Sequence, residues 1–413
     1  MKNATLELLA PAGSFECMMA AIQAGADAVY FGVEQLNMRT RSTANFLLSD
    51  LPEIAAIAKQ HQIKTYLTLN TIIYDHDISL MKKLVDAAKK NNITAIIASD
   101  LAVMNYARKI NQAVHISTQA NITNVDTIEF YAAYADVMVM ARELSLLQVA
   151  AIYKEILRRQ IKGPNGKLVR LEIFGHGALC MAVSGKCYLS LHSDFASANR
   201  GACIQNCRRS YIVTDKETGK EMEIDNEYIM SAKDLCTIDF LDKIVDTGVA
   251  VLKIEGRGRS ADYVYTTTKC YREAIAAIAD HTYSKEKIEE WKARLATVYN
   301  RGFWDGYYLG RTMGEWSDTY GSQATKRKIY LAKGLKYFDQ QQVGEFQMEA
   351  NVLEAGDEIM ITGPSTGIIQ MQIGEMRVNN QTTTEVKKGM VFSLPVAQKI
   401  RPSDKLYKIV DAV

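Results

Sequence analysis

Residues 64–70 (KTYLTLN), 78–91 (ISLMKKLVDAAKKN) and 95–99 (AIIAS) decide the fold, because a short apolar run alternates here with an amphipathic one. The first and third runs have the length of buried strands, and the middle run spaces its apolar residues as a helix does. Two strands joined by one helix predict a parallel βαβ unit.

The same alternation extends along the chain in both directions. Further strands are predicted at 6–10, 28–33, 115–120, 137–142, 170–175 and 249–255, and further helices at 14–24, 51–60, 101–110, 125–135 and 145–159. Eight such strands are the number that closes a barrel, so we predict an α/β fold of the (β/α)8, TIM-like type. A doubly wound open sheet is the alternative.

The predicted barrel occupies residues 1–325 and carries a cysteine-rich insertion at about 180–236. Within the insertion, residues 215–227 predict an exposed hairpin with its turn at Thr218 and Gly219. From residue 328 to 413 short alternating runs are separated by turn signals, which predicts a small all-β barrel as a second domain.

Composition limits the classes of partner. The net charge of +2 is too small for a protein that grips nucleic acid over a wide area, so any such contact should be local. Neither an export signal nor an apolar run of about 20 residues is visible, which predicts a cytoplasmic protein with no membrane partner.

Polar residues follow most of the predicted strands. In a (β/α)8 barrel they would gather at the C-terminal rim, where active sites of that fold are built. The alternative is that polar residues simply end strands. The residues are Asn37, Arg39, Asn70, Gln119, Asn121, Arg142, Glu143, His176, Glu255 and Arg257.

Four of the seven cysteines lie between residues 180 and 207, and Cys236 follows. In a reducing compartment such a group predicts a metal or redox site and not disulfides. Zinc sites favour close cysteine pairs, which only Cys203 and Cys207 form, whereas an iron–sulfur cluster needs only convergence in space. Idle thiols are the alternative, and Cys17 and Cys270 are predicted to be buried in helices.

A hydrolytic site has weaker support. His176 is the histidine just ahead of Cys180, and a cysteine nucleophile needs a base within hydrogen-bond reach. The sequence contains neither a Gly-x-Ser-x-Gly elbow nor a His-Glu-x-x-His helix. No recognisable motif for hydrolysis is therefore present.

Three stretches carry a family resemblance. They are Glu172-x-Phe174-x-His176-Gly177-Ala178-x-Cys180-x6-Cys187, Asn199-Arg200-Gly201-x-Cys203-x-Gln205-x-Cys207-Arg208 and Ser231-x-Lys233-Asp234-Leu235-Cys236. They closely resemble the signature of the collagenase-like peptidase family U32. The resemblance covers about residues 6 to 325, and the β tail is similar to the family's C-terminal barrel.

The resemblance implies a function beyond the family's name. Better understood members hydroxylate RNA, and the two-domain layout is most similar to the branch that forms 5-hydroxyuridine at the wobble position of tRNA with prephenate. It implies a [4Fe-4S] cluster as cofactor, with tRNA and a small dicarboxylate as partners. A second family member is a further partner compatible with the resemblance. Hydroxylation of ribosomal RNA or of a quinone ring, and collagenase-like peptidase activity, are the alternatives.

The resemblance also implies site residues. The predicted cluster ligands are Cys180, Cys187, Cys203 and Cys236, with Cys207 as the alternative to Cys203, and zinc is the alternative metal. From their position at the rim, Arg39, Arg142 and Arg257 are predicted to bind the carboxylates of prephenate, because guanidinium groups make bidentate contacts with carboxylates. Structural ion pairs are the alternative for each arginine.

Overall fold

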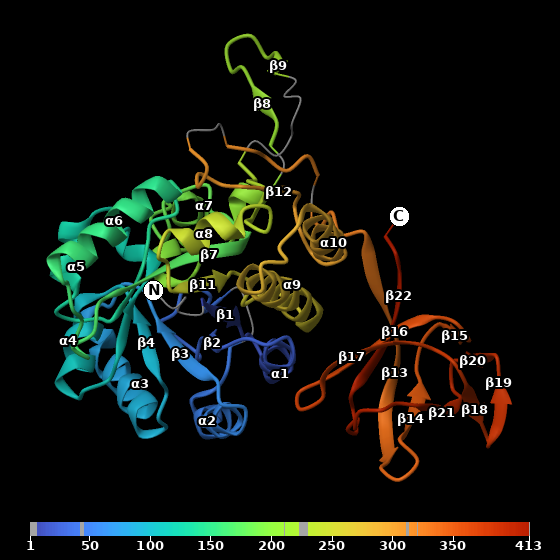
Figure 1. The fold of residues 1–413 in the computed structure, drawn as a ribbon. Coiled ribbons are helices and arrows are strands. Elements are labelled where there is room, and N and C mark those ends of the chain that lie inside the picture. The colour runs from blue at the N-terminus through green and yellow to red at the C-terminus, as the bar shows by residue number, and fades with distance from the viewer. Residues whose placement is uncertain are drawn as a thin grey trace.

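The computed structural model describes residues 6–41, 45–209, 211–222, 230–310, 314–319 and 321–412 (Figure 1). Eight parallel strands form a closed barrel in which β11 pairs with both β1 and β7. The predicted barrel is therefore confirmed, and the open sheet is excluded. Its strands are β1 (Glu7–Pro11), β2 (Ala28–Phe31), β3 (Lys64–Leu69), β4 (Ala95–Ala98), β5 (Val114–Ile116), β6 (Val137–Val139), β7 (Arg170–Ala178) and β11 (Val251–Ile254).

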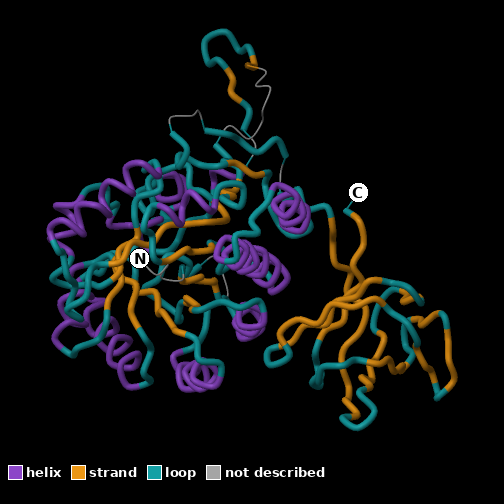
Figure 2. Tube along the Cα trace, viewed as in Figure 1, coloured by secondary structure: helices purple, strands orange, loops and turns teal. Residues whose placement is uncertain are grey.

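Helices surround the barrel (Figures 1 and 2). Several begin where predicted because a polar N-cap side chain accepts a backbone N–H, as Ser14 does from Cys17 and Asp100 does from Ala102. The helices are α1 (Phe15–Gln23), α2 (Leu51–Gln60), α3 (Ile78–Lys90), α4 (Leu101–Lys109), α5 (Val125–Tyr131), α6 (Leu146–Arg159), α8 (Leu241–Asp246), α9 (Ala261–Ala279) and α10 (Lys285–Ala296). Short 3-10 turns precede or follow them at η1 (Leu48–Asp50), η2 (Asp75–Asp77) and η3 (Thr118–Ala120).

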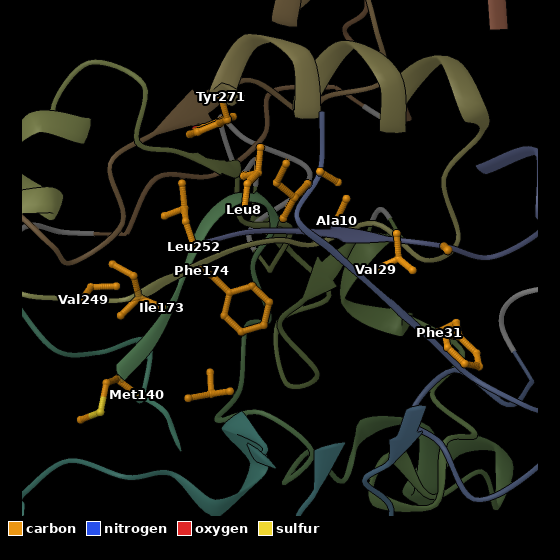
Figure 3. Packing of buried hydrophobic residues seen from close by; sticks show 14 of the residues in the cluster. Leu8, Ala10, Val29, Phe31, Met140, Ile173, Phe174, Val249, Leu252 and Tyr271 are labelled. Atoms are coloured by element: carbon orange, nitrogen blue, oxygen red, sulfur yellow. The ribbon is translucent and has the colours of Figure 1, made fainter. Parts of the chain in front are cut away.

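The strand alternation creates two packing layers. Leu8, Val29 and Leu252 belong to the large cluster that packs against the helices (Figure 3). Their strand neighbours Leu9 and Val251 belong to a second cluster inside the barrel. Because successive strand residues point to opposite faces and both faces are covered, the barrel strands carry buried apolar residues on both sides.

The insertion follows β7, as predicted. It holds α7 (Leu189–Asp194), the turns η4 (Ala198–Arg200) and η5 (Asn206–Arg208), and the hairpin of β8 (Val213–Thr214) and β9 (Glu221–Met222). The hairpin projects from the barrel in Figure 1 and turns through Gly219, whose φ of +67° suits glycine. Residues 223–227 of the predicted hairpin lie outside the described residues.

Two short strands extend the sheet beyond the barrel. β10 (Asp234–Cys236) runs antiparallel to the end of β7, and β12 (Phe303–Trp304) pairs in parallel with β10. Neither strand was predicted. β10 comes directly after the insertion, whereas β12 comes after α10, so the pairing brings these two distant segments together beside β7.

The C-terminal segment is all-β, as predicted. Its eight-stranded antiparallel sheet has the order β17-β16-β22-β13-β14-β21-β18-β19, and β15 pairs with β20. No described ladder joins the end strands β17 and β19, so the sheet is open where a closed barrel was expected. The strands are β13 (Lys326–Phe338), β14 (Val343–Met348), β15 (Val352–Glu354), β16 (Glu358–Gly363), β17 (Gly367–Gln372), β18 (Met376–Val378), β19 (Gln381–Thr383), β20 (Glu385–Lys387), β21 (Val391–Pro395) and β22 (Lys405–Asp411).

The sheet domain is tied to α1 and α9. The Gln23 side chain donates to the Thr366 carbonyl and accepts from the Ile368 N–H, each at 2.8 Å. Lys328 forms an ion pair with Asp262 at 2.6 Å. No helix in the described part of the chain is long and apolar enough to span a membrane.

Candidate active site at the barrel rim

A cavity of about 150 Å³, here called the thiol cavity, lies at the C-terminal rim of the barrel. Side chains from loops far apart in the sequence line it, because the C-terminal ends of parallel strands meet there. Predicted rim residues in its lining are Arg39, Asn70, Gln119, Arg142, Glu255 and Arg257.

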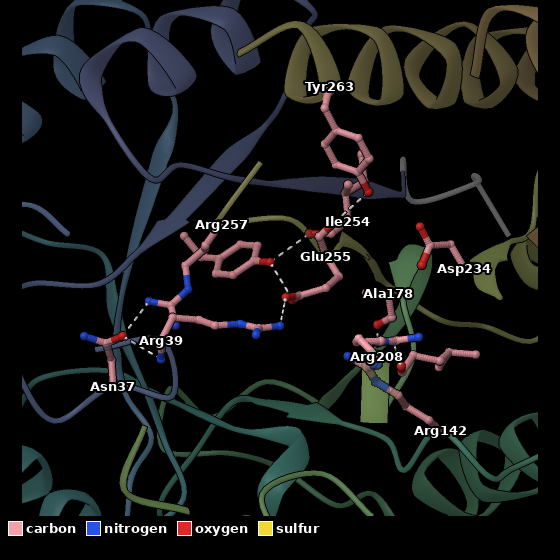
Figure 4. A network of polar contacts seen from close by, with 12 residues as sticks. Asn37, Arg39, Arg142, Ala178, Arg208, Asp234, Ile254, Glu255, Arg257 and Tyr263 are labelled. Atoms are coloured by element: carbon pink, nitrogen blue, oxygen red, sulfur yellow. Dashed lines mark hydrogen bonds and ion pairs between the residues drawn. The ribbon is translucent and has the colours of Figure 1, made fainter. Parts of the chain in front are cut away.

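The Glu255 carboxylate lies among the arginines of the rim (Figure 4). Glu255 accepts from Arg39 Nη2 at 3.1 Å and from the Tyr30 hydroxyl at 3.1 Å. Burial would raise the pKa of Glu255, but the guanidinium groups of Arg39, Arg142 and Arg257 outweigh burial and hold this pKa at about 2. Glu255 is therefore a fixed negative charge at the cavity.

Arg257 is held by neutral groups. Its Nη1 donates to Asn37 Oδ1 at 3.1 Å (Figure 4). Arg257 also donates from the same nitrogen to Thr68 Oγ1 at 2.8 Å. Burial lowers its pKa to about 10, so it remains charged at neutral pH. Asn37, a predicted rim residue, thus contacts the site through Arg257.

Thr68 and Tyr30 also contact the charged rim residues, but each lies within a predicted strand and not at its end. Their residue types are ordinary for strands, which is why the sequence did not mark them as site residues.

Arg142 has no carboxylate within ion-pair distance among the described residues. Its Nη1 donates to the Ala178 carbonyl at 2.9 Å, and its guanidinium lies 3.8 Å from the centre of the Phe174 ring. Its Nε is buried without a hydrogen-bond partner in the described structure. Four arginines, Arg208 included, line the cavity with one glutamate, and the nearby Lys253 is paired with Glu172, so the cavity suits an anion.

The insertion brings four cysteines to the same cavity, namely Cys180, Cys187, Cys203 and Cys207. Burial raises the pKa of the Cys207 thiol, the neighbouring Arg208 lowers it, and the other three thiols raise it further. Thiols separated by up to 27 positions in the sequence therefore lie close together in space.

Backbone contacts fix the insertion over the rim. Gly201 has a φ of +78°, and a Cβ there would lie 2.2 Å from the Asn37 carbonyl oxygen, so only glycine fits. Arg200 forms an ion pair with Asp77 at 2.5 Å, and the Ile72 N–H donates to the Asn199 carbonyl. The Asn199-Arg200-Gly201 stretch therefore anchors the cysteine-bearing segment to the loops after β2 and β3.

Cys236 lies apart from the other four cysteines. It is buried in β10, with its Sγ 3.8 Å from the Tyr271 hydroxyl of α9, and burial raises its pKa to about 11. It does not line the thiol cavity. β10 directs the Cys236 side chain into the layer beneath α9, so the structure does not place Cys236 with the other three predicted ligands. The fourth cysteine in the thiol cavity is Cys207.

The thiols are not arranged as a finished metal site. Among the described residues, no three histidine, cysteine, aspartate or glutamate side chains are close enough to hold one ion. Four thiols do agree in type and number with an iron–sulfur cluster. Loading a cluster would require the 180–207 segment to draw them closer together.

His176 does not form a dyad with Cys180. The histidine is buried beside Tyr263, Tyr271 and Phe303, whereas Cys180 is exposed. Burial and the nearby Arg259 lower the pKa of His176 to about 3, so it stays neutral. The predicted rim position of His176 is wrong, since it packs outside the barrel and is not a base for a thiol nucleophile.

Residues 13–318 match the model of peptidase family U32. The chain belongs to this family. Two relatives named collagenase, both from Porphyromonas gingivalis, are 57% and 52% identical to this chain. The matches cover 97% and 87% of this chain and 97% and 98% of the relatives' own. tRNA hydroxylation protein P1 of Bacillus subtilis is 31% identical, covering 87% of this chain and 83% of its own.

The family prediction is thus confirmed, but the predicted order of likeness is wrong. The relatives named collagenase are much more similar to this U32 chain than the tRNA hydroxylation protein is. The predicted order follows from the two-domain layout, but relatives with either name match most of this chain. Layout therefore could not separate the branches.

Proposed function

We propose that this U32 protein hydroxylates RNA, forming 5-hydroxyuridine at the wobble position of tRNA, with prephenate as co-substrate and an iron–sulfur cluster as cofactor. The observation that carries the proposal is the shared cavity, in which Cys180, Cys187, Cys203 and Cys207 face Arg39, Arg142 and Arg257. A peptidase has no evident need for four thiols beside an anion site.

The four thiols of the cavity are the proposed cluster ligands, with Cys207 in place of Cys236. A bound [4Fe-4S] cluster supplies electron transfer. The chain's part is to present the thiolates, and Arg208 supports this by donating to the Leu179 and Ala232 carbonyls at 2.5 and 2.7 Å. These bonds hold the start of the insertion, next to Cys180, at the rim.

The arginines are the proposed site for the two carboxylates of prephenate. Arg142 is well placed, because it has no carboxylate within ion-pair distance in the described structure, its Nε lacks a hydrogen-bond partner there, and its contact with the Phe174 ring orients it. Arg39 and Arg257 keep the net charge positive although Glu255 stays ionised. Glu255 itself would repel a second anion and so restricts where the acid can lie.

Collagenase-like peptidase activity is the second candidate, favoured by the names of the relatives at 57% and 52% identity. The site geometry gives it less support. Hydrolysis by a thiol needs an activated nucleophile with a base in reach, and the neutral, buried His176 cannot serve Cys180.

Mass spectrometry of tRNA nucleosides tests the proposal. A strain that lacks this gene should lose 5-hydroxyuridine, the wild-type gene should restore it, and Cys207→Ala should not. The purified protein should leave denatured collagen intact. Unchanged 5-hydroxyuridine in the deletion strain, together with collagen cleavage by the purified protein, would overturn the proposal in favour of the peptidase.

A further inference from the structure

A second cavity of about 150 Å³, here called the aromatic cavity, adjoins the thiol cavity. Cys180 and Arg142 line both cavities, so the two share a wall. The far wall of the aromatic cavity is built from Trp304, Tyr307 and Trp316. These residues belong to the glycine- and aromatic-rich segment after α10, to which the proposed function assigns no role.

The aromatic wall is fixed to the barrel through β10. Leu235 pairs with Trp304, and an isolated bridge joins Ala232 to Trp316. The hydroxyl of Tyr308, next to Tyr307, donates to the Phe174 carbonyl at 2.8 Å. The wall is therefore preorganised, which lowers the entropic cost of binding a rigid ligand.

The wall can receive a flat ring with polar edges. The Trp304 and Tyr307 rings meet edge to face at 5.4 Å, and Tyr307 remains 37% exposed. Trp304 Nε1 is a buried donor without a partner in the described structure. Asn121 and Glu143 add an amide and a carboxylate to the lining. Aromatic walls with a few polar groups are how proteins hold unstacked bases.

We infer that the aromatic cavity binds a nucleobase turned out of the RNA strand, an inference that depends on the proposed function. The base then lies on one side of Cys180 and the small acid on the other. A target base must leave its stack to reach a site in an enzyme interior, and the shared wall places it beside the thiols. The cavity thereby serves as a substrate subsite distinct from the anion site.

Binding of short RNAs to the purified full-length protein tests this inference. One labelled RNA carries a single uridine, and a matched RNA is abasic at that position. Tyr307→Ala should weaken binding of the uridine RNA about tenfold, because the stacking surface is lost. Tyr307→Phe keeps the ring and should bind within about twofold of wild type. Phe195→Ala removes an exposed aromatic outside both cavities and should change nothing.

The abasic RNA separates this subsite from general RNA affinity. It should bind more weakly than the uridine RNA and equally to all variants. If Tyr307→Ala weakens both RNAs alike or neither, the cavity assignment is wrong while the proposed function stands. If wild type binds neither RNA, the proposed function fails as well. Binding of a Gly-Pro-rich peptide with the same dependence on Tyr307 would assign the cavity to a peptide and overturn the inference.

Discussion

At the scale of single residues, charge balance decides what the rim can bind. Arg39 is matched by Glu255, and Lys253 is matched by Glu172. Arg142 is held by a carbonyl and an aromatic ring, neither of which carries a charge. An anion that enters the thiol cavity can therefore pair with Arg142 without displacing a carboxylate, as it can with Arg257, which is also held by neutral groups.

Replacing Arg142 tests the anion site. Arg142→Ala should weaken prephenate binding about ten- to a hundredfold, since a hydrogen bond to a charged group contributes about 1.5–3 kcal/mol. Isothermal titration calorimetry on the purified protein measures the change. Arg158→Ala is the matched control, because Arg158 pairs with Glu155 on the exposed face of α6. Equal losses in both variants would remove Arg142 from the site.

His176 makes stability depend on pH in a defined direction. Its pKa in the folded chain is about 3, against about 6.5 for an unfolded histidine. Below pH 6.5 the unfolded chain binds a proton that the folded chain does not, so stability falls as the pH drops towards 3. This contribution is fully present above pH 6.5.

Urea denaturation at pH 7 and pH 5 measures the effect. Between pH 7 and pH 5 the wild-type chain should lose about 2 kcal/mol more of its free energy of unfolding than His176→Asn does. The figure follows from about 1.4 kcal/mol per pH unit below the unfolded pKa. The exposed His61 provides the control, and His61→Asn should behave as wild type. An unchanged pH dependence in His176→Asn would show that the buried histidine is protonated in the folded chain.

At the scale of elements, the barrel closes where β7 meets β11, and a buried ion pair crosses this seam. Lys253 Nζ lies 2.8 Å from Glu172 Oε1, with side chains 6% and 0% exposed. Glu172 Oε2 has no partner in the described structure. Removing the lysine would leave a buried carboxylate without compensation, which costs more than the pair itself contributes.

Lys253→Met should therefore reduce the free energy of unfolding by about 3 kcal/mol, measured by urea denaturation. The double variant Lys253→Met/Glu172→Leu should recover most of that loss, because no charge stays buried. Lys326→Met, which breaks an exposed pair with Asp411, should cost less than about 1 kcal/mol. A double variant as unstable as the single one would contradict this explanation.

At the scale of the whole molecule, the barrel could be predicted because its strands are buried on both faces and its helices carry polar caps. β10 and β12 could not, since neither belongs to the alternation of apolar runs and amphipathic helices that marks the barrel strands. The choice among the five clustered cysteines stays a prediction, because sequence spacing alone does not say which thiols meet. Only pairing between β10 and β7 shows that Cys236 points beneath α9 and leaves Cys207 at the cavity.

Contact between the two domains adds a prediction at this scale. Gly367 and Gly356 both have positive φ, so alanine strains the backbone at either position. A Cβ at Gly367 would also lie 2.3 Å from Gln23 Oε1, whereas none of the atoms around Gly356 comes within 4 Å. Gly367→Ala should therefore speed limited proteolysis between the domains more than Gly356→Ala does. Equal rates would mean that the Gln23 contact does not hold the domains together.

Iron and sulfide analysis of anaerobically purified protein tests the central claim most directly. The wild-type chain and Cys236→Ala should each carry about four iron atoms, the content of one [4Fe-4S] cluster, and Cys207→Ala should carry almost none. Iron retained in Cys207→Ala but lost in Cys236→Ala would contradict the ligand set. An iron-free wild-type protein that still restores 5-hydroxyuridine to tRNA would contradict the cluster itself.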